Sequence, residues 1–163
     1  MNFDQAFTEL IGTEGGYSNR NPIDDPGGET MWGVTLHTAR ESGYEGDMRD
    51  LPQETAKAIY AEKYWHAAHC DDLPALARFN LFDAAVNHGP EQAMKLLQDA
   101  AGVDADGKFG PHTQAAVAAA DPHALMRRFN AFRIDLMVSL INWHANAGGW
   151  MHRVAKNLRS ETA

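Results

Sequence analysis

The chain is 163 residues long, and 44% of its residues are hydrophobic and 22% charged. These proportions are ordinary for a soluble globular protein, and the length suits one domain with a core of its own. The formal net charge of −8 argues against binding nucleic acid through its phosphates, and it makes bulk attraction to a polyanionic surface unfavourable.

Cysteine usage and hydropathy bear on where the chain is made. Cys70 is the single cysteine, which excludes an intrachain disulfide and is expected of a protein that folds in a reducing cytoplasm. The first residues do not resemble a cationic, apolar signal peptide, and no apolar run reaches ~18 residues. We therefore expect synthesis in the cytoplasm, no insertion into a membrane, and a monomer.

An apolar stripe at helical spacing predicts an amphipathic helix at the start of the chain. Glu14 follows Leu10 by four residues, so it continues this stripe near the helix C-terminus. Burial and the negative end of the helix dipole would both raise its pKa, which suits a general acid that protonates a sugar oxygen. The alternative is a solvated glutamate in a last turn closed by glycines. The stripe consists of Phe3, Ala6, Phe7, Leu10 and Ile11.

A glycine-rich segment behind Glu14 offers a second carboxylate, which glycosidic cleavage usually needs. Asp25 precedes Pro-Gly-Gly, where the backbone can approach a ligand closely. Thr30 and Thr35 offer hydroxyls that can hold a water, and Asp24 and Glu29 are less favoured substitutes for Asp25. The alternative for Asp25 is an ordinary turn aspartate bonded to its own backbone. Strand signals are concentrated at 17–35, where we expect a short hairpin.

Two helices are predicted next, a short one capped by Thr35 and one over about 50–64. Tyr64 and Trp65 close the second helix, where they could stack on a sugar ring or, for at least one of them, fill the core. His66, His69 and Cys70, with Asp71, have a spacing that could bind zinc. A fourth ligand is not evident in the sequence nearby, so we expect no metal and no cofactor.

Residues 74–88 form a strongly apolar predicted helix in which Asp83 and Asn87 share one face. Buried polar groups need partners, and either a structural network or a substrate groove would supply them. A further helix runs from Pro90 to a stop at Gly102. The segment 104–111 has some calcium-loop character but lacks the third ligand and the final glutamate, so a tight turn is predicted.

The remaining sequence is predicted to be helical. Pro111 opens an alanine-rich helix to about Ala120, and Asp121 with Pro122 starts a long one. We expect Gly148-Gly149 to interrupt this helix before a last short one. The fold class is therefore mainly α, with a small β-hairpin or loop lobe beside an active-site cleft. We assign one domain to 1–163, with a catalytic half (1–90) and a C-terminal helical half (91–163).

An ordered set of motifs resembles a known family. Glu14-Gly15-Gly16-Tyr17 is followed by Asp25-Pro26-Gly27-Gly28 with Thr30, and then by Trp32-Gly33-Val34-Thr35. Together with later motifs these are similar to glycoside hydrolase family 108, lysozyme-like N-acetylmuramidases that include many phage endolysins. The later motifs, in order, are Ile59-Tyr60 with Tyr64-Trp65, residues 82–90, Leu97-Gln98, residues 106–111 with Thr113, and Gly149-Trp150 with Arg153-Val154.

The resemblance implies a lysozyme-like fold in which Glu14 is the catalytic acid and the C-terminal half binds peptidoglycan. The expected reaction is cleavage of the β-1,4 bond between N-acetylmuramic acid and N-acetylglucosamine in the glycan strands. A phage origin would imply cell-wall lysis, an antimicrobial effect, and release from the cytoplasm through a holin-type lesion. The candidate site residues are Glu14, Asp25 and Thr30 for catalysis, and Tyr17, Thr35, Tyr64, Trp65, Asp83 and Asn87 for substrate binding.

Two other function classes are compatible with the residues. A zinc amidase or peptidase of the wall peptides would use some of the eight histidines, and a chelator would inhibit it. A non-catalytic wall-binding module would bind wall fragments without releasing reducing sugar.

Overall fold

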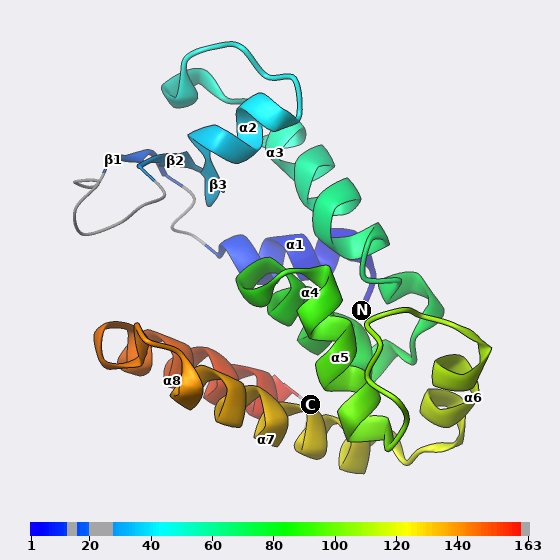
Figure 1. Ribbon diagram of the computed structural model, residues 1–163. Helices are drawn as coiled ribbons and strands as arrows, with labels where there is room; N and C mark the ends of the chain where they lie inside the picture. The colour runs from blue at the N-terminus through cyan, green and yellow to red at the C-terminus, as the bar shows by residue number, and fades with distance from the viewer. Residues whose placement is uncertain (13–15, 20–27, 161–163) are drawn as a thin grey trace. The chain divides into compact units, whose positions relative to one another are not determined.

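The computed structural model describes residues 1–12, 16–19 and 28–160, and side chains to 159. It is mainly α-helical with a small three-stranded antiparallel sheet (Figure 1), which confirms the predicted fold class at that level. The chain divides into two compact units, one of residues 3–63 and one of residues 1–2 with the chain from Tyr64 onward. The expected cleft beside the small lobe stays a prediction.

The smaller unit carries the sheet, whose strands are ordered β1-β2-β3 with Thr30 opposite both Ser18 and Thr35. Thr35 caps α2 as predicted, since its hydroxyl accepts a hydrogen bond from the Thr38 amide at 3.2 Å. The elements are α1 (Phe3–Ile11), β1 (Ser18–Asn19), β2 (Glu29–Met31), β3 (Val34–Thr35), α2 (Leu36–Glu41), the 3-10 turn η1 (Met48–Asp50) and α3 (Gln53–Tyr60).

Helix α1 contains the whole predicted apolar stripe, from Phe3 to Ile11. It ends at Ile11, and Gly12 has φ +60°, a left-handed conformation that commonly closes a helix. The Gly12 amide donates to the Thr8 carbonyl at 2.9 Å. Glu14, which the sequence placed near the end of this helix, lies outside the described residues, so its placement stays a prediction.

Trp32 and Gly33 form the two-residue turn between β2 and β3. Both have positive φ, +53° and +74°, as the two central residues of a type I′ hairpin turn require. A tryptophan rarely adopts this conformation, and its indole Nε1 donates to the Leu51 carbonyl at 2.9 Å. This hydrogen bond fixes the Trp-Gly-Val-Thr motif to η1 within the smaller unit.

Gly33 is predicted to tolerate no side chain. A Cβ there would lie 2.6 Å from the hydroxyl of Tyr60, which is only 3% exposed. Gly33→Ala should lower the free energy of unfolding by about 2–4 kcal/mol, because it adds backbone strain to overpacking. Urea denaturation measures this. Gly43→Ala is the matched control: Gly43 has φ +84° but nothing within 4 Å of a Cβ. Equal losses in the two variants would contradict the role of Tyr60.

The larger unit is built around α4, which is buried along most of its length. Trp65 packs edge-on against Phe82 of this helix, with ring centroids 5.4 Å apart. Helix α5 packs on both α4 and α7, and α7 packs on α8. The boundary between the two units falls within the π-helical η2 (Ala61–His66). The elements after it are the 3-10 turn η3 (Cys70–Asp72), α4 (Ala75–His88), α5 (Pro90–Ala101), α6 (Pro111–Ala119), α7 (Pro122–Ser139) and α8 (Trp143–Ser160).

The predicted break at Gly148-Gly149 is wrong. Helix α8 runs through both glycines, and the chain leaves helical geometry earlier, between Ser139 and Trp143. Each glycine costs a helix about 1 kcal/mol relative to alanine, a penalty that tertiary packing can override. That packing is present here: Val154 and Asn157 are buried, and α8 lies along α7 (Figure 1).

Candidate functional site

Of the three predicted catalytic residues, the structure describes one. Glu14 and Asp25 lie outside the described residues, and Thr30 lies in the middle of β2. Thr30 is half-buried and stands in register with Thr35 on β3. The Thr35 hydroxyl is already used at the start of α2, because it also donates to the Thr38 hydroxyl at 3.0 Å. Thr35 therefore caps α2, in addition to any contact that it makes with substrate.

Tyr17 is held by side chains from two neighbouring elements. Its hydroxyl donates to Glu29 Oε1 at 2.7 Å, and the Arg49 guanidinium lies 4.9 Å from the centre of its ring. The hydrogen bond to Glu29 is the main reason that the pKa of Tyr17 is raised. Glu29, a substitute candidate for the second carboxylate, is thus engaged with Tyr17 in this structure.

The two aromatic groove candidates differ in exposure. Trp65 is 0% exposed, so its ring fills the core, which is the alternative that the sequence analysis allowed for at least one of the pair. A fully buried ring offers no face to a sugar, and we withdraw Trp65 as a stacking residue. Tyr64 is half-buried, and its proposed contact with substrate stays a prediction.

Asp83 anchors a buried charged network. It is 2% exposed, and its two carboxylate oxygens lie 2.7 Å from Arg133 Nη1, 2.9 Å from Arg153 Nη1 and 2.9 Å from Asn157 Nδ2. Arg133 Nη1 is close enough to the Asp83 carboxylate for an ion pair, but the N–H group is not aligned for a hydrogen bond. The sequence left open whether Asp83 belongs to a structural network or to a substrate groove. The structure shows the network, so the predicted substrate-binding role of Asp83 is wrong.

Asn87 follows Asp83 by one helical turn but does not join the charged network. Its side chain is exposed, and Nδ2 donates to the Asp83 backbone carbonyl at 2.6 Å. This local bond uses the amide nitrogen of the side chain. Its assignment as a substrate-binding residue stays a prediction.

His88 lies next to this network and is held neutral. Arg133 Nε lies 3.4 Å from His88 Nε2, which must accept because a guanidinium nitrogen can only donate. Burial first, and then the charge of Arg133, lower the pKa of His88 to about 4, although Asp83 opposes the shift. Protonating His88 would place a further cation beside two arginines that share one carboxylate.

His88 is predicted to make the protein less stable in mild acid. Because its folded pKa lies below the unfolded value of ~6.5, its contribution is complete above that pH and is lost as the pH falls toward 4. The free energy of unfolding should decline in this window with a slope of at most ~1.4 kcal/mol per pH unit. Urea denaturation from pH 7 to 4.5 measures this. The slope should flatten in His88→Gln, and an unchanged slope would contradict the assignment.

The candidate zinc ligands do not form a metal centre. Cys70 is buried, and burial raises the pKa of its thiol, which disfavours the thiolate that zinc binds. The His69 ring stacks on Phe109 with centroids 5.2 Å apart, and its Nδ1 lies 3.2 Å from Asp72 Oδ2. Within the ranges 1–12, 16–19 and 28–160, no three His, Cys, Asp or Glu side chains cluster as metal ligands.

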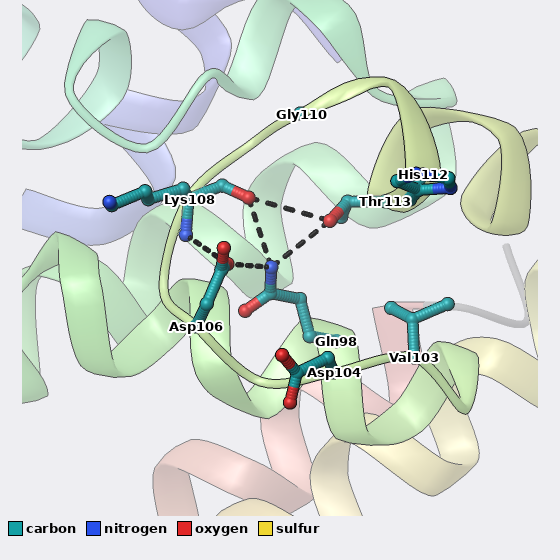
Figure 2. Close-up of a pocket in the computed structure, with 8 residues that line it drawn as sticks. All are labelled: Gln98, Val103, Asp104, Asp106, Lys108, Gly110, His112 and Thr113. Carbon is teal, nitrogen blue, oxygen red and sulfur yellow. Dashed lines mark hydrogen bonds between the residues drawn. The ribbon is translucent and has the colours of Figure 1, made fainter.

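A polar pocket in the larger unit was not predicted. The expected tight turn at 104–111 is present, with Gly107 at φ +78°, but its organising residue is Gln98 on α5 (Figure 2). Gln98 is 1% exposed and bonds to Asp106, Lys108, Gly107 and Thr113. A polar residue inside an apolar helical stripe was the available signal for it.

Comparison with known proteins places this fold among the glycosyl hydrolases. Residues 7–89 match the family model described as Glycosyl hydrolase 108, which spans α1 to the end of α4 and includes Glu14, Asp25 and Thr30. The chain belongs to glycosyl hydrolase family 108. Residues 92–155 match a second model, described as a predicted peptidoglycan domain. The predicted division into a catalytic half (1–90) and a C-terminal half (91–163) stays a prediction.

A solved structure, that of Brucella abortus SagA, is similar over nearly all of both chains. It is 32% identical, with a TM-score of 0.88 over 98% of this chain and 93% of that chain. A search among curated proteins found no match. Among the residues that the structure describes, no helix has the length and apolarity needed to cross a bilayer.

Proposed function

We propose that this protein hydrolyses the β-1,4 bond between N-acetylmuramic acid and N-acetylglucosamine of peptidoglycan, with Glu14 as the general acid. The observation that carries the proposal is the pairing of two family matches on one chain. A glycosyl hydrolase region covers residues 7–89, and a predicted peptidoglycan region covers 92–155. The first match indicates the reaction class, which is hydrolysis of a glycosidic bond, and the second indicates that the polymer cleaved is peptidoglycan.

In this mechanism Glu14 protonates the leaving sugar oxygen as the bond breaks. Asp25, with the hydroxyl of Thr30, orients and deprotonates a water or stabilises the oxocarbenium ion. An inverting reaction needs carboxyl groups ~6.5–9.5 Å apart, and a retaining one needs ~5–5.5 Å. We assign substrate contacts to Tyr17, Thr35, Tyr64 and Asn87.

The described part of the smaller unit supports these roles by bracing the motif residues. The Tyr17–Glu29 hydrogen bond joins the start of β1 to β2, and Thr30 pairs with Thr35 across β2 and β3. The Trp32 indole ties the turn to Leu51. Side chains on such a braced sheet lose little entropy on binding, which favours a preorganised site.

Mass analysis of digested peptidoglycan tests the proposal. A muramidase releases fragments that end in reducing muramic acid. Freed peptides would indicate an amidase, and reducing glucosamine ends would indicate cleavage of the other glycosidic bond; either result contradicts the proposal. Wall binding without any release of reducing sugar would leave only a binding module.

We also propose that the biological setting is cell-wall lysis of the phage endolysin type. The support is the resemblance of the ordered motifs to that group. In that setting the protein is made in the cytoplasm and reaches the wall through a holin-type lesion. Lysis of cells that co-express the protein with a holin, but not of cells that express it alone, is the expected result.

A further inference from the structure

A cavity lies within the region that matches the predicted peptidoglycan domain. Its volume is about 520 Å³, within the range of ~300–1,000 Å³ typical of small-ligand sites. The end of α5, the loop that follows it and the first turn of α6 form its walls (Figure 2). Each of these elements belongs to the larger compact unit, so the cavity is complete within one part of the fold.

Hydrogen bonds from a buried glutamine preorganise the cavity wall. Gln98 Nε2 donates to Asp106 Oδ1 at 2.8 Å and to the Lys108 carbonyl at 2.9 Å, while its Oε1 accepts from the Gly107 amide at 2.8 Å. Asp106 Oδ1 also accepts from the Lys108 amide at 2.8 Å. The loop is thus fixed before a ligand arrives, which lowers the entropy cost of binding.

The cavity presents negative charge. Asp104 and Asp106 both line it, and Asp104 makes no hydrogen bond or ion pair with another described residue. Hydrogen bonds from the Lys108 amide and from Gln98 hold the pKa of Asp106 below its ordinary value, so it stays ionised in mild acid. Figure 2 shows the Lys108 side chain extending away from Gln98 and Thr113. Its charge also helps to lower the pKa of Asp106, so one lysine offsets part of the charge of the two aspartates and the lining stays net negative.

The lining chemistry favours a peptide over a sugar. Pyranose rings pack on aromatic faces, yet no Phe, Tyr or Trp is among the described lining residues. The nearby Phe109 ring is instead stacked on His69. In peptidoglycan the N-acetyl and lactyl groups of the glycan are neutral or anionic, whereas a free amine on the stem's diamino acid is cationic.

We propose that this cavity binds the peptide stem of peptidoglycan and takes the side-chain amine of its diamino acid between Asp104 and Asp106. The proposal rests on the proposed function, since it assumes that peptidoglycan is the substrate. It gives an acidic protein a local attraction to a polyanionic polymer. It also separates the two recognition tasks, with glycan at the hydrolase region and peptide at the second region.

The test uses the full-length protein, labelled with ¹⁵N, and a soluble stem tripeptide that ends in lysine, whose side-chain amine has no carboxylate beside it. In an NMR titration with this peptide, saturable changes in chemical shift are expected at the backbone amides of Gly107, Lys108, Gly110 and Thr113. Asp104→Asn should weaken binding about 2- to 5-fold, the range expected for one exposed charge pair, and raising the salt should weaken it further. Acetylating the side-chain amine should have a similar or larger effect. Asp99→Asn is the matched control, because Asp99 is exposed on α5 and does not line the cavity.

The proposal is overturned if the tripeptide leaves these amides unchanged, or if Asp104→Asn and Asp99→Asn bind equally well. Shifts of the same amides by a peptide-free glycan fragment, but not by the tripeptide, would also overturn it. The tripeptide contains no glycosidic bond, so binding is measured independently of hydrolysis. Absent tripeptide binding together with release of reducing muramic acid would refute only the peptide site. Tripeptide binding without that release would refute only the proposed reaction.

Discussion

Replacing Glu14 by glutamine is expected to lower peptidoglycan hydrolysis by ~10²–10⁴-fold, the usual contribution of a general acid. Glutamine keeps the size of the side chain but has no proton to give to the leaving oxygen. The release of reducing muramic acid from purified walls, measured by mass spectrometry at fixed enzyme concentration, gives the rate. The melting temperature should stay close to that of the unmodified protein, because the change removes a proton donor rather than a packing group.

Glu45→Gln is the matched control for Glu14→Gln. Glu45 is an exposed residue of the connector before η1, so its loss changes the net charge equally and should leave the rate unaltered. Asp25→Asn then tests the second carboxylate. A folded Glu14→Gln variant that clears wall at nearly the normal rate would show that another residue is the acid.

Replacing Asp83 by asparagine is expected to lower the free energy of unfolding by about 3–5 kcal/mol, the cost of breaking a buried ion pair by removing one partner. Arg133 is 0% exposed and would keep its charge without the carboxylate 2.7 Å away. Arg153 and Asn157 contact different oxygens of this carboxylate, and asparagine keeps only one of the two as an acceptor. Urea denaturation measures the change.

Two further variants make the Asp83 prediction specific. Asp99→Asn removes an exposed aspartate from the neighbouring helix α5 and should change stability by less than ~0.5 kcal/mol. Asp83→Leu combined with Arg133→Met replaces the pair with apolar groups, and it should recover much of the loss seen in Asp83→Asn. A loss below about 1 kcal/mol in Asp83→Asn would mean that the network contributes little.

The Asp83 network also bears on how the two family regions fold. Asp83 belongs to the match over 7–89, whereas Arg133 and Arg153 belong to the match over 92–155. All three side chains meet inside one compact unit. The hydrolase match is therefore not a separate folding module, since one of its buried charges is paired with arginines of the second match.

Local sequence rules worked where the governing interactions are themselves local. Thr35 and Asp121 cap helices because a short hydroxyl or carboxylate reaches the amide three residues ahead, at 3.2 Å and 2.8 Å. Pro90, Pro111 and Pro122 begin helices, as expected of a residue whose missing N–H costs nothing there. Gly102 ends α5 in the left-handed conformation.

The sequence by itself therefore determined the helical fold class, most helix starts and stops, and the family whose motifs carry the proposed chemistry. The tertiary structure decided which polar and aromatic side chains are buried and what they contact. Trp65 lies in the core, and Asp83 forms buried ion pairs. Gln98 holds the loop at 104–111 by hydrogen bonds, and α8 continues through two glycines. The physical reason is range: capping and turn preferences act over a few residues, whereas burial and charge pairing join residues as far apart in sequence as Asp83 and Asn157.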